Sequence, residues 1–293
     1  MSHEIIHMET DHEQIIHHPF FMSKVLTIIA SLAAVLAALY FLSSCQTVPV
    51  TGRQQLSFVP SSTILPMSFN SYTDFVSKHK VIENTPQAQA VKRVGTRIQH
   101  AGERYMSERN MLDRLNGYQW EFNLVEDKQI NAWCMPGGKV VVYSGILPVT
   151  GDETGLAVVM GHEIGHAIAN HGGERMSQDL LAQMGGMALS EALSTRPQET
   201  QKLFMGAYGL GSQIGVLLPY SRIQESEADH LGLIFMAMAG YDPQHSVEFW
   251  QRMASKQQGA APPEFLSTHP ADRTRIRDIE RLIPEAMTYY KKY

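Results

Sequence analysis

The chain has 293 residues, of which 44% are hydrophobic and 18% are charged, and its formal net charge is −5 at pH 7. This acidic balance offers none of the basic surface that binds nucleic acid, so a nucleic-acid partner is not expected. Only two cysteines are present, Cys45 and Cys134. Cys134 lies in an apolar stretch, which is typical of a buried hydrophobic side chain and not of a nucleophile.

The N-terminal part of the chain resembles an export signal. Residues 1–21 are polar and rich in histidine, and they precede a short basic stretch at 22–24 and an uncharged apolar run at 25–42. Two serines separate this run from Cys45, a pattern that resembles the lipobox of a bacterial lipoprotein. We therefore predict that residues 1–44 are an N-terminal extension and signal peptide and that Cys45 carries the lipid. A transmembrane anchor is the alternative, because the run approaches the length that spans a bilayer.

Either arrangement predicts that the rest of the chain is exported and tethered to a membrane. The several acyl chains of a bacterial lipoprotein would hold it firmly, whereas a single chain holds weakly. Gln46 follows the cysteine where an Asp would resemble the inner-membrane signal, so the outer membrane is expected. Acylation of Cys45 would leave Cys134 without a disulfide partner. We expect residues 45–60 to form a linker and turn, and residues 61–293 to form one domain.

The next part of the chain has the pattern of a helix followed by a small sheet. Residues 84–106 have helical apolar spacing, with Asn84 or Thr85 as the N-cap and Pro86 in the first turn. Three strands are predicted after this helix, at residues 120–125, 131–135 and 139–143. A Pro-Gly-Gly turn separates the last two strands.

The HExxH pattern His162-Glu163-Ile164-Gly165-His166 lies in a stretch with helical apolar spacing. Histidines four residues apart share one face of a helix, so both imidazoles reach a single ion. Glu163 then lies beside the ion, where its carboxylate can take a proton from metal-bound water. Gly161 and Gly165 indicate close approach of another backbone or a ligand, because glycine inside a helix costs about 1 kcal/mol.

A catalytic zinc site needs a third ligand beyond the two histidines. The metzincin spacing is absent after His166, and His171 is too close along the helix to share the ion, so we expect it to be a surface residue or to contact a ligand. Glu225 and Asp229 are better candidates, because they lie four residues apart at the start of a second helix. One of them can bind zinc while the other accepts a hydrogen bond from a ligand histidine. We expect Glu227, on another face, to be a solvated charge.

Residues 172–219 are rich in methionine and glycine and have a mostly helical pattern. One interpretation is a pair of core helices that return Glu225 to the histidines, and another is a mobile lid over the active site. We favour core helices with a partly mobile tip. A further helix is expected from Asp242 to Met253, and the last helix follows Ser267-Thr268-His269-Pro270.

Three of these motifs together resemble one family of zinc metallopeptidases. They are His-Glu-Ile-Gly-His at 162–166, Glu-Ser-Glu-Ala-Asp at 225–229 and Ser-Thr-His-Pro at 267–270. They look like those of the family that includes the CAAX prenyl endoproteases, HtpX-type membrane proteases, mitochondrial Oma-type proteases and BepA-like periplasmic proteases. The resemblance runs from about residue 48 to residue 281. It implies a mainly helical α+β fold of the gluzincin type, a zincin-like metallopeptidase domain with a small β-sheet beside the HExxH helix.

The resemblance also implies a role for each motif residue. Glu163 matches the catalytic base, Asp229 matches an acid that supports a ligand, and one Zn²⁺ would be held by His162, His166 and Glu225. His269 and Arg275 would lie at the active-site cleft. His269 would stabilise the oxyanion, contact substrate or bind the resting zinc, and Arg275 would support an acidic ligand or the oxyanion. The alternative for this segment is a helix cap with a surface salt bridge.

The small sheet has two interpretations. The resemblance implies that Asn131, Ala132 and Trp133 form an edge strand to which an extended substrate adds by main-chain hydrogen bonds. A core hairpin without such a role is the alternative.

The activity predicted from the sequence is zinc-dependent hydrolysis of peptide bonds in unfolded or misassembled proteins, on the periplasmic side of a bacterial envelope. Polypeptide substrates and a membrane, reached through the lipid at Cys45, are the expected partners. Two other classes stay open. One is a periplasmic chaperone or assembly factor that binds extended polypeptide and cuts little. The other is a zinc hydrolase for a different amide, such as a cell-wall crosslink.

Overall fold

The structure is a computed structural model that describes residues 45–196, 198–213, 218–256 and 263–291, together with isolated helical positions between Lys24 and Leu36. The chain divides into two compact units, Met1–Ser44 and Cys45–Tyr293. The predicted lipobox serines and most of the predicted signal peptide lie outside the described residues, whereas Cys45 is described and exposed. Among the helices described, none combines the length and apolar character needed to cross a bilayer.

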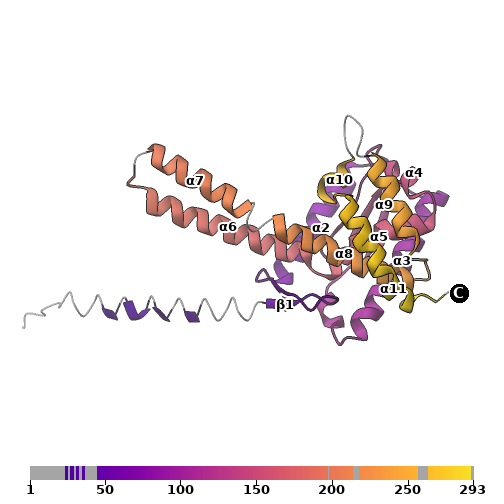
Figure 1. Cartoon of the computed structure of the whole chain (residues 1–293), viewed down its shortest axis with the longest axis horizontal. Coiled ribbons are helices and arrows are strands. Elements are labelled where there is room, and N and C mark those ends of the chain that lie inside the picture. The colour runs from indigo at the N-terminus through magenta and orange to yellow at the C-terminus, as the bar shows by residue number, and fades with distance from the viewer. Residues whose placement is uncertain are drawn as a thin grey trace, which may run out of the picture. The chain divides into compact units, whose positions relative to one another are not determined.

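The second unit is mainly helical, with two small sheets (Figure 1). Its helices are α2 (Ser61–Lys78), α3 (Pro86–Ser107), α4 (Leu147–Thr150), α5 (Glu153–Ile168), α6 (His171–Leu193), α7 (Gln198–Ser212), α8 (Leu218–Met238), α9 (His245–Ser255), α10 (Glu264–Thr268) and α11 (Arg273–Tyr289). Its strands are β1 (Cys45–Thr47), β2 (Gln54–Leu56), β3 (Val81–Ile82), β4 (Glu121–Val125), β5 (Ala132–Met135) and β6 (Lys139–Tyr143). Short 3₁₀ turns occupy Leu112–Leu115 and Ser144–Ile146. The prediction of a mainly helical α+β fold is confirmed.

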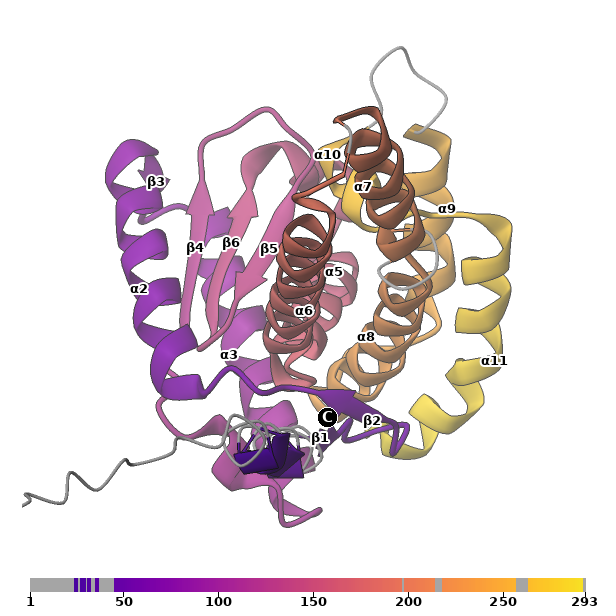
Figure 2. The same cartoon turned by 90° about the vertical axis from the view of Figure 1, so that its left-hand side faces the viewer.

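The larger sheet has the strand order β3-β4-β6-β5. β4 and β6 are parallel, and the other neighbours are antiparallel. The three predicted strands are confirmed to within one residue at each end, and the helix before them begins after the cap Thr85, as predicted. Figure 2 shows β5 on the side of the sheet that faces α5 and α6. The sheet therefore lies beside the HExxH helix α5, and the strand nearest to this helix is the edge strand β5.

α5 is the central element of the core. Its first turn is capped by Asp152, whose Oδ1 accepts a hydrogen bond from the backbone N–H of Gly155 at 2.8 Å. Every residue from Gly155 to Ile168 is buried. The helix contacts α3, α8, α9 and β5, so its apolar residues are covered on all sides. The two histidines and the glutamate of HExxH are thus held in the interior and not on a surface face.

Two glycines of α5 allow α8 to approach it closely. A Cβ at Gly161 would lie 2.9 Å from the carbonyl oxygen of Gly232, and one at Gly165 would lie 2.9 Å from that of Ala228. A Cβ at Gly232 would lie 2.8 Å from the backbone nitrogen of His162. The expectation that glycine marks a close backbone approach is confirmed, and this contact brings the acidic motif of α8 to the histidines.

The prediction that residues 172–219 form core helices is wrong for most of their length. α6 and α7 pack against each other and extend away from the core in Figure 1. Only the first part of α6 is buried. The apolar residues beyond it are exposed, among them Leu180, Met184, Met187, Leu203 and Phe204. Apolar composition indicated burial, but no other described element covers this part of the hairpin, and it is α8 that returns the acidic motif to α5.

We expect Gly161→Ala to lower the free energy of unfolding by about 1–3 kcal/mol, because the new methyl group forces α5 and α8 apart. Chemical denaturation of the metal-free protein measures this change. Gly206→Ala on α7 is the matched control, since nothing lies within 4 Å of its Cβ position. The control should be neutral or stabilised by up to about 1 kcal/mol, because alanine favours helix more than glycine does. Equal stability of Gly161→Ala and the wild type would contradict the close-packing argument.

Candidate active site

Four side chains from three elements bring their donor atoms together. They are His162 and His166 of α5, Glu225 of α8 and His269, which follows α10, and their donor atoms all lie within 4.8 Å of one another. His166 Nε2 lies 3.1 Å from His162 Nε2 and 3.1 Å from Glu225 Oε1. His269 Nδ1 lies 3.1 Å from His162 Nε2 and 2.9 Å from Glu225 Oε2. The three histidines are buried.

This cluster fits a metal ion. Ligand atoms around a tetrahedral zinc lie about 3.3 Å apart, close to the spacing found here, and imidazole nitrogen and carboxylate oxygen are common zinc ligands. Facing imidazole nitrogens cannot all donate to one another, so a shared cation satisfies them better than hydrogen bonds do. Glu163 Oε1 is buried and accepts no hydrogen bond, although His269 Nε2 lies 3.4 Å away. One oxygen of the HExxH carboxylate thus lies beside the cluster without accepting a hydrogen bond.

Asp229 and Arg275 orient His162. The Nδ1–H of His162 donates to Asp229 Oδ1 at 2.9 Å, which leaves Nε2 facing the cluster. Arg275 donates from Nε and Nη2 to the two oxygens of Asp229, both at 2.8 Å, and its Nη1 lies 3.3 Å from Glu225 Oε2. Its guanidinium also stacks on Trp250. Asp229 therefore lies where an acid that supports a ligand is expected. Arg275 contacts two acidic side chains and is buried, so the surface salt bridge is excluded.

The prediction for Glu227 is wrong, and of the two alternatives for His171 only the contact with a ligand is confirmed. Glu227 is 2% exposed and ion-paired, not a solvated charge, because the segment after Cys45 covers this side of α8 and brings Arg53 to it. His171 is fully buried and is not on the HExxH helix. α5 ends at Ile168, Asn170 adopts a left-handed conformation with φ 58°, and α6 begins at His171. This reversal brings His171 Nδ1 to 2.8 Å from His166 Nδ1.

The buried charges of the site shift several pKa values. Burial lowers the pKa of His162, but the hydrogen bonds that its ring donates to Asp229 and Glu225 outweigh this effect and raise the pKa to about 9. Burial holds the pKa of His166 well below its usual range. Burial raises the pKa of Glu225, but the surrounding histidines bring it far below its usual range. The metal-free site thus carries a proton on His162, which a metal must displace when it binds.

β5 lies beside this site. It is an end strand of the sheet, and Ala132 and Cys134 pack into the core that contains α5. Burial raises the pKa of the Cys134 thiol, as does the nearby Glu163, which opposes a nucleophilic role. Trp133 points to the other face of the sheet, where its ring packs edge-on against Phe75 of α2 at 4.9 Å between centroids.

Asn131 immediately precedes β5 and ties its start to the sheet. Its side-chain oxygen accepts from the N–H of Ala132 at 2.9 Å, and its carbonyl accepts from the N–H of Tyr143 at 3.1 Å. The structure therefore places β5 against α5, with the Trp133 ring on the opposite face of the sheet.

Comparisons with known proteins match the chain to one peptidase family. A model described as "Peptidase family M48" matches residues 93–283, a region that contains all four cluster residues, Glu163, Asp229 and Arg275. The chain is 31% identical over 252 residues to the mitochondrial metalloendopeptidase OMA1 of Schizosaccharomyces pombe, covering 84% of this chain and 69% of that protein. It is 28% identical over 262 residues to the human OMA1, covering 86% and 48%. It is 32% identical over 163 residues to the beta-barrel assembly-enhancing protease of Yersinia pestis, covering 54% and 33%.

We expect the metal-free protein to lose up to about 3 kcal/mol of stability as the pH rises from about 6.5 to about 9. The pKa of His162 is raised from 6.5 to about 9 by folding, so its contribution is complete below pH 6.5 and is lost as the pH passes 9. His166 and His171 have lowered pKa values and change stability only below pH 6.5. Urea unfolding of chelator-treated protein across this range measures the loss.

Asp229→Asn is the comparison for this pH series. The variant removes the carboxylate that raises the pKa of His162, so its stability should decline less between pH 6.5 and 9. A wild type whose stability is flat across the range would show that His162 is not protonated in the folded, metal-free protein.

Proposed function

The chain belongs to peptidase family M48 and is a metalloendopeptidase, and we propose that it is a zinc-dependent endopeptidase of the bacterial envelope that hydrolyses unfolded or misassembled proteins. The catalytic part of this proposal is supported mainly by Glu163, whose buried Oε1 accepts no hydrogen bond and lies beside four converging donor side chains. A protein that only binds polypeptide has no need of such a base. This feature favours hydrolysis over the chaperone alternative.

The proposed metal ligands are His162, His166 and Glu225. These residues would hold a zinc ion, which would supply a bound water of lowered pKa and a Lewis acid for the scissile carbonyl. Glu163 Oε1 accepts the proton of the attacking water and passes it to the leaving amine. Asp229 and Arg275 hold His162 and Glu225 in place through the hydrogen bonds and ion pair described above. Of its two expected roles, we therefore propose that Arg275 holds the carboxylates of Glu225 and Asp229 in place.

We propose two roles for His269, one for each state of the site. Its Nδ1 lies among the donor atoms, which supports a role as an additional ligand in the resting site. Its Nε2 lies 3.4 Å from Glu163 Oε1, so the ring also lies beside the proposed base. Substrate entry would displace the ring, and its N–H would then be available to the oxyanion of the reacting carbonyl.

We propose that substrate binds as an added strand along β5. Two observations support this: β5 is an end strand of its sheet, and it packs against α5. Main-chain hydrogen bonds hold many different sequences, which suits a protease for unfolded chains. The cell-wall alternative would instead need a small polar pocket for one particular amide.

The envelope location rests on the sequence before Cys45 and on the bacterial relatives. Cys45 is exposed, as a lipid attachment site must be. The bacterial matches are named for β-barrel assembly, whereas the OMA1 matches are mitochondrial, so the relatives alone support more than one location. The lipobox-like pattern favours the bacterial envelope, with the outer membrane as the proposed anchor site.

We expect Glu163→Gln to reduce cleavage of an unfolded protein at least about 100-fold while zinc stays bound, because the amide cannot accept the proton of water. Wild type and variant are each assayed with and without a chelator, and zinc content is measured in both. Cleavage by the variant at the wild-type rate would contradict the role of Glu163. Zinc bound by both proteins without cleavage by either would favour the chaperone alternative.

We expect backbone N-methylation of a peptide substrate to raise KM with a period of two residues. Alternate residues of an added strand direct their N–H groups to the neighbouring strand, and each lost bond removes about 1 kcal/mol, or roughly fivefold. A series of peptides methylated at one position each measures the pattern. Equal effects at every position would contradict strand addition along β5.

A further inference from the structure

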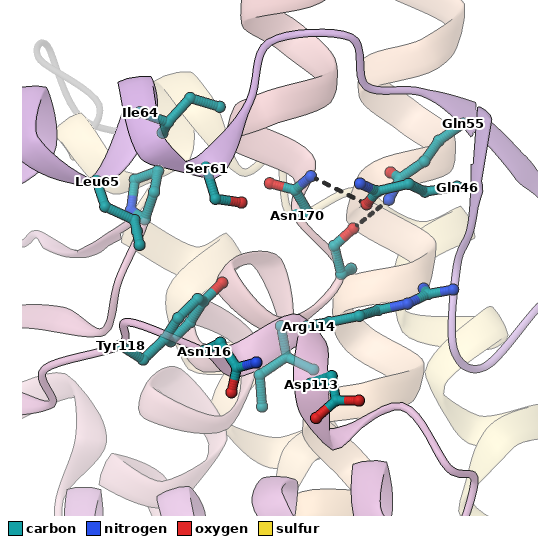
Figure 3. Close-up of a pocket in the computed structure, with 13 residues that line it drawn as sticks. Gln46, Gln55, Ser61, Ile64, Leu65, Asp113, Arg114, Asn116, Tyr118 and Asn170 are labelled. Carbon is teal, nitrogen blue, oxygen red and sulfur yellow. Dashed lines mark hydrogen bonds between the residues drawn. The ribbon is translucent and has the colours of Figure 1, made fainter. Parts of the chain in front are cut away.

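The segment that follows Cys45 packs against the end of the HExxH helix. β1 and β2 pair antiparallel, and this hairpin lies beside the turn between α5 and α6. Gln55 Nε2 donates to the carbonyl of Ala169 at 2.7 Å, and Asn170 Nδ2 donates to Ser57 Oγ at 2.9 Å. Figure 3 shows Gln46 and Gln55 beside Asn170. The segment is thus attached to the chain within four residues of the ligand His166.

Arg53, between the two strands of this hairpin, binds two buried carboxylates. Its Nη1 and Nη2 donate to the two oxygens of Glu174 at 2.6 and 2.8 Å, and its Nε and Nη2 donate to those of Glu227 at 3.0 and 2.8 Å. Glu174 on α6 is 0% exposed and Glu227 on α8 is 2% exposed. Two buried carboxylates side by side require a cation, and Arg53 supplies it with a geometry that lysine does not offer.

The hydrogen bonds continue from Glu227 to the metal site. His171 Nε2 lies 3.2 Å from Glu227 Oε2, and His171 Nδ1 lies 2.8 Å from His166 Nδ1. His166 Nε2 faces the donor cluster, so its proton must be on Nδ1 and must be donated to His171 Nδ1. His171 then carries its own proton on Nε2 and donates it to Glu227. One assignment of tautomers satisfies every contact.

The two histidine ligands are therefore supported in parallel ways. His162 is held by Asp229, which is bound by Arg275 from the C-terminal helix. His166 is held by His171, which is bound by Glu227, and this carboxylate is bound by Arg53 from the segment after Cys45. Each of these two series of hydrogen bonds leads from a histidine to a carboxylate of α8 that is paired with an arginine. Hydrogen-bond partners of this kind fix the ring orientation of a metal-binding histidine.

We propose that Arg53 is a positioning residue of the metal centre, acting through Glu227 and His171 to hold His166 in its metal-binding tautomer. The segment after Cys45 thus supplies a residue that positions a proposed metal ligand, in addition to connecting the domain to the N-terminus. The inference rests on the proposed metal ligands. It predicts that removing Arg53 weakens metal binding, although this residue does not touch the metal.

The experiment measures the zinc dissociation constant of the full-length chain by competition with a chelator of known affinity. Arg53→Met and His171→Leu should raise the constant roughly ten- to a hundredfold. His171→Asn should lose less, because its Oδ1 can still accept the proton of His166 Nδ1. Arg114→Met is the matched control, since Arg114 also binds this segment, at the carbonyl of Thr47, but touches no member of the hydrogen-bonded chain. The control should bind zinc within twofold of the wild type.

Two further readouts separate positioning from general loss of structure. The visible spectrum of the Co²⁺-loaded protein should shift in Arg53→Met and not in Arg114→Met, because only the former alters the field around His166. The double variant Arg53→Met/His171→Leu should bind zinc no more weakly than His171→Leu alone, since both changes break one chain. Thermal unfolding of the metal-free forms shows that each variant is folded.

The outcomes decide between this inference and the proposed function. An unchanged dissociation constant in folded Arg53→Met, an equal loss in Arg114→Met, or additive losses in the double variant would overturn the positioning role alone. Should Arg53→Met fail to fold, His171→Asn and His171→Leu decide, and equal affinities for these two would overturn it. A wild type that binds no zinc would overturn the proposed metal site itself.

Discussion

The close contact between α5 and α8 is the constraint on which the site depends. Gly161 and Gly165 face Gly232 and Ala228 at distances that leave no room for a side chain. This approach lets short carboxylate side chains on α8 reach imidazoles on α5, so Glu225 meets both histidines within 3.4 Å. A wider separation of the helices would move the carboxylates away from the cluster. The glycines thus allow the carboxylates and imidazoles to meet, although none of them carries a functional group.

The same two helices organise the rest of the chain around them. α8 supplies three acidic side chains to the site, and each has a distinct partner: Glu225 faces the donor cluster, Asp229 pairs with Arg275, and Glu227 pairs with Arg53. The two arginines come from opposite ends of the described domain. Buried carboxylates are costly unless they are paired, so both ends of the chain must pack correctly for the site to be stable. Folding and assembly of the metal centre are therefore coupled.

The sequence was most informative where the signal is local. The four-residue spacings of His162 and His166, and of Glu225 and Asp229, follow from helix geometry, and both pairs lie as predicted. The burial of Glu227 does not follow from the sequence, because its partner Arg53 is 174 residues away and no local pattern connects the two residues. The contact of His171 with His166 is as predicted, but its place at the start of a new helix is not, because no local pattern indicates that the left-handed conformation of Asn170 ends α5. The apolar composition of α6 and α7 predicts burial, but composition does not show whether another element covers these apolar side chains.

The position of the metal can be measured by diffraction from crystals of the zinc-loaded protein, with data collected at the zinc absorption edge. Zinc bound at the proposed site gives one anomalous peak about 2.0–2.2 Å from His162 Nε2, His166 Nε2 and a carboxylate oxygen of Glu225. A zinc peak held elsewhere, for example by the histidines of residues 1–21, or no peak within the cluster, would contradict the proposed site.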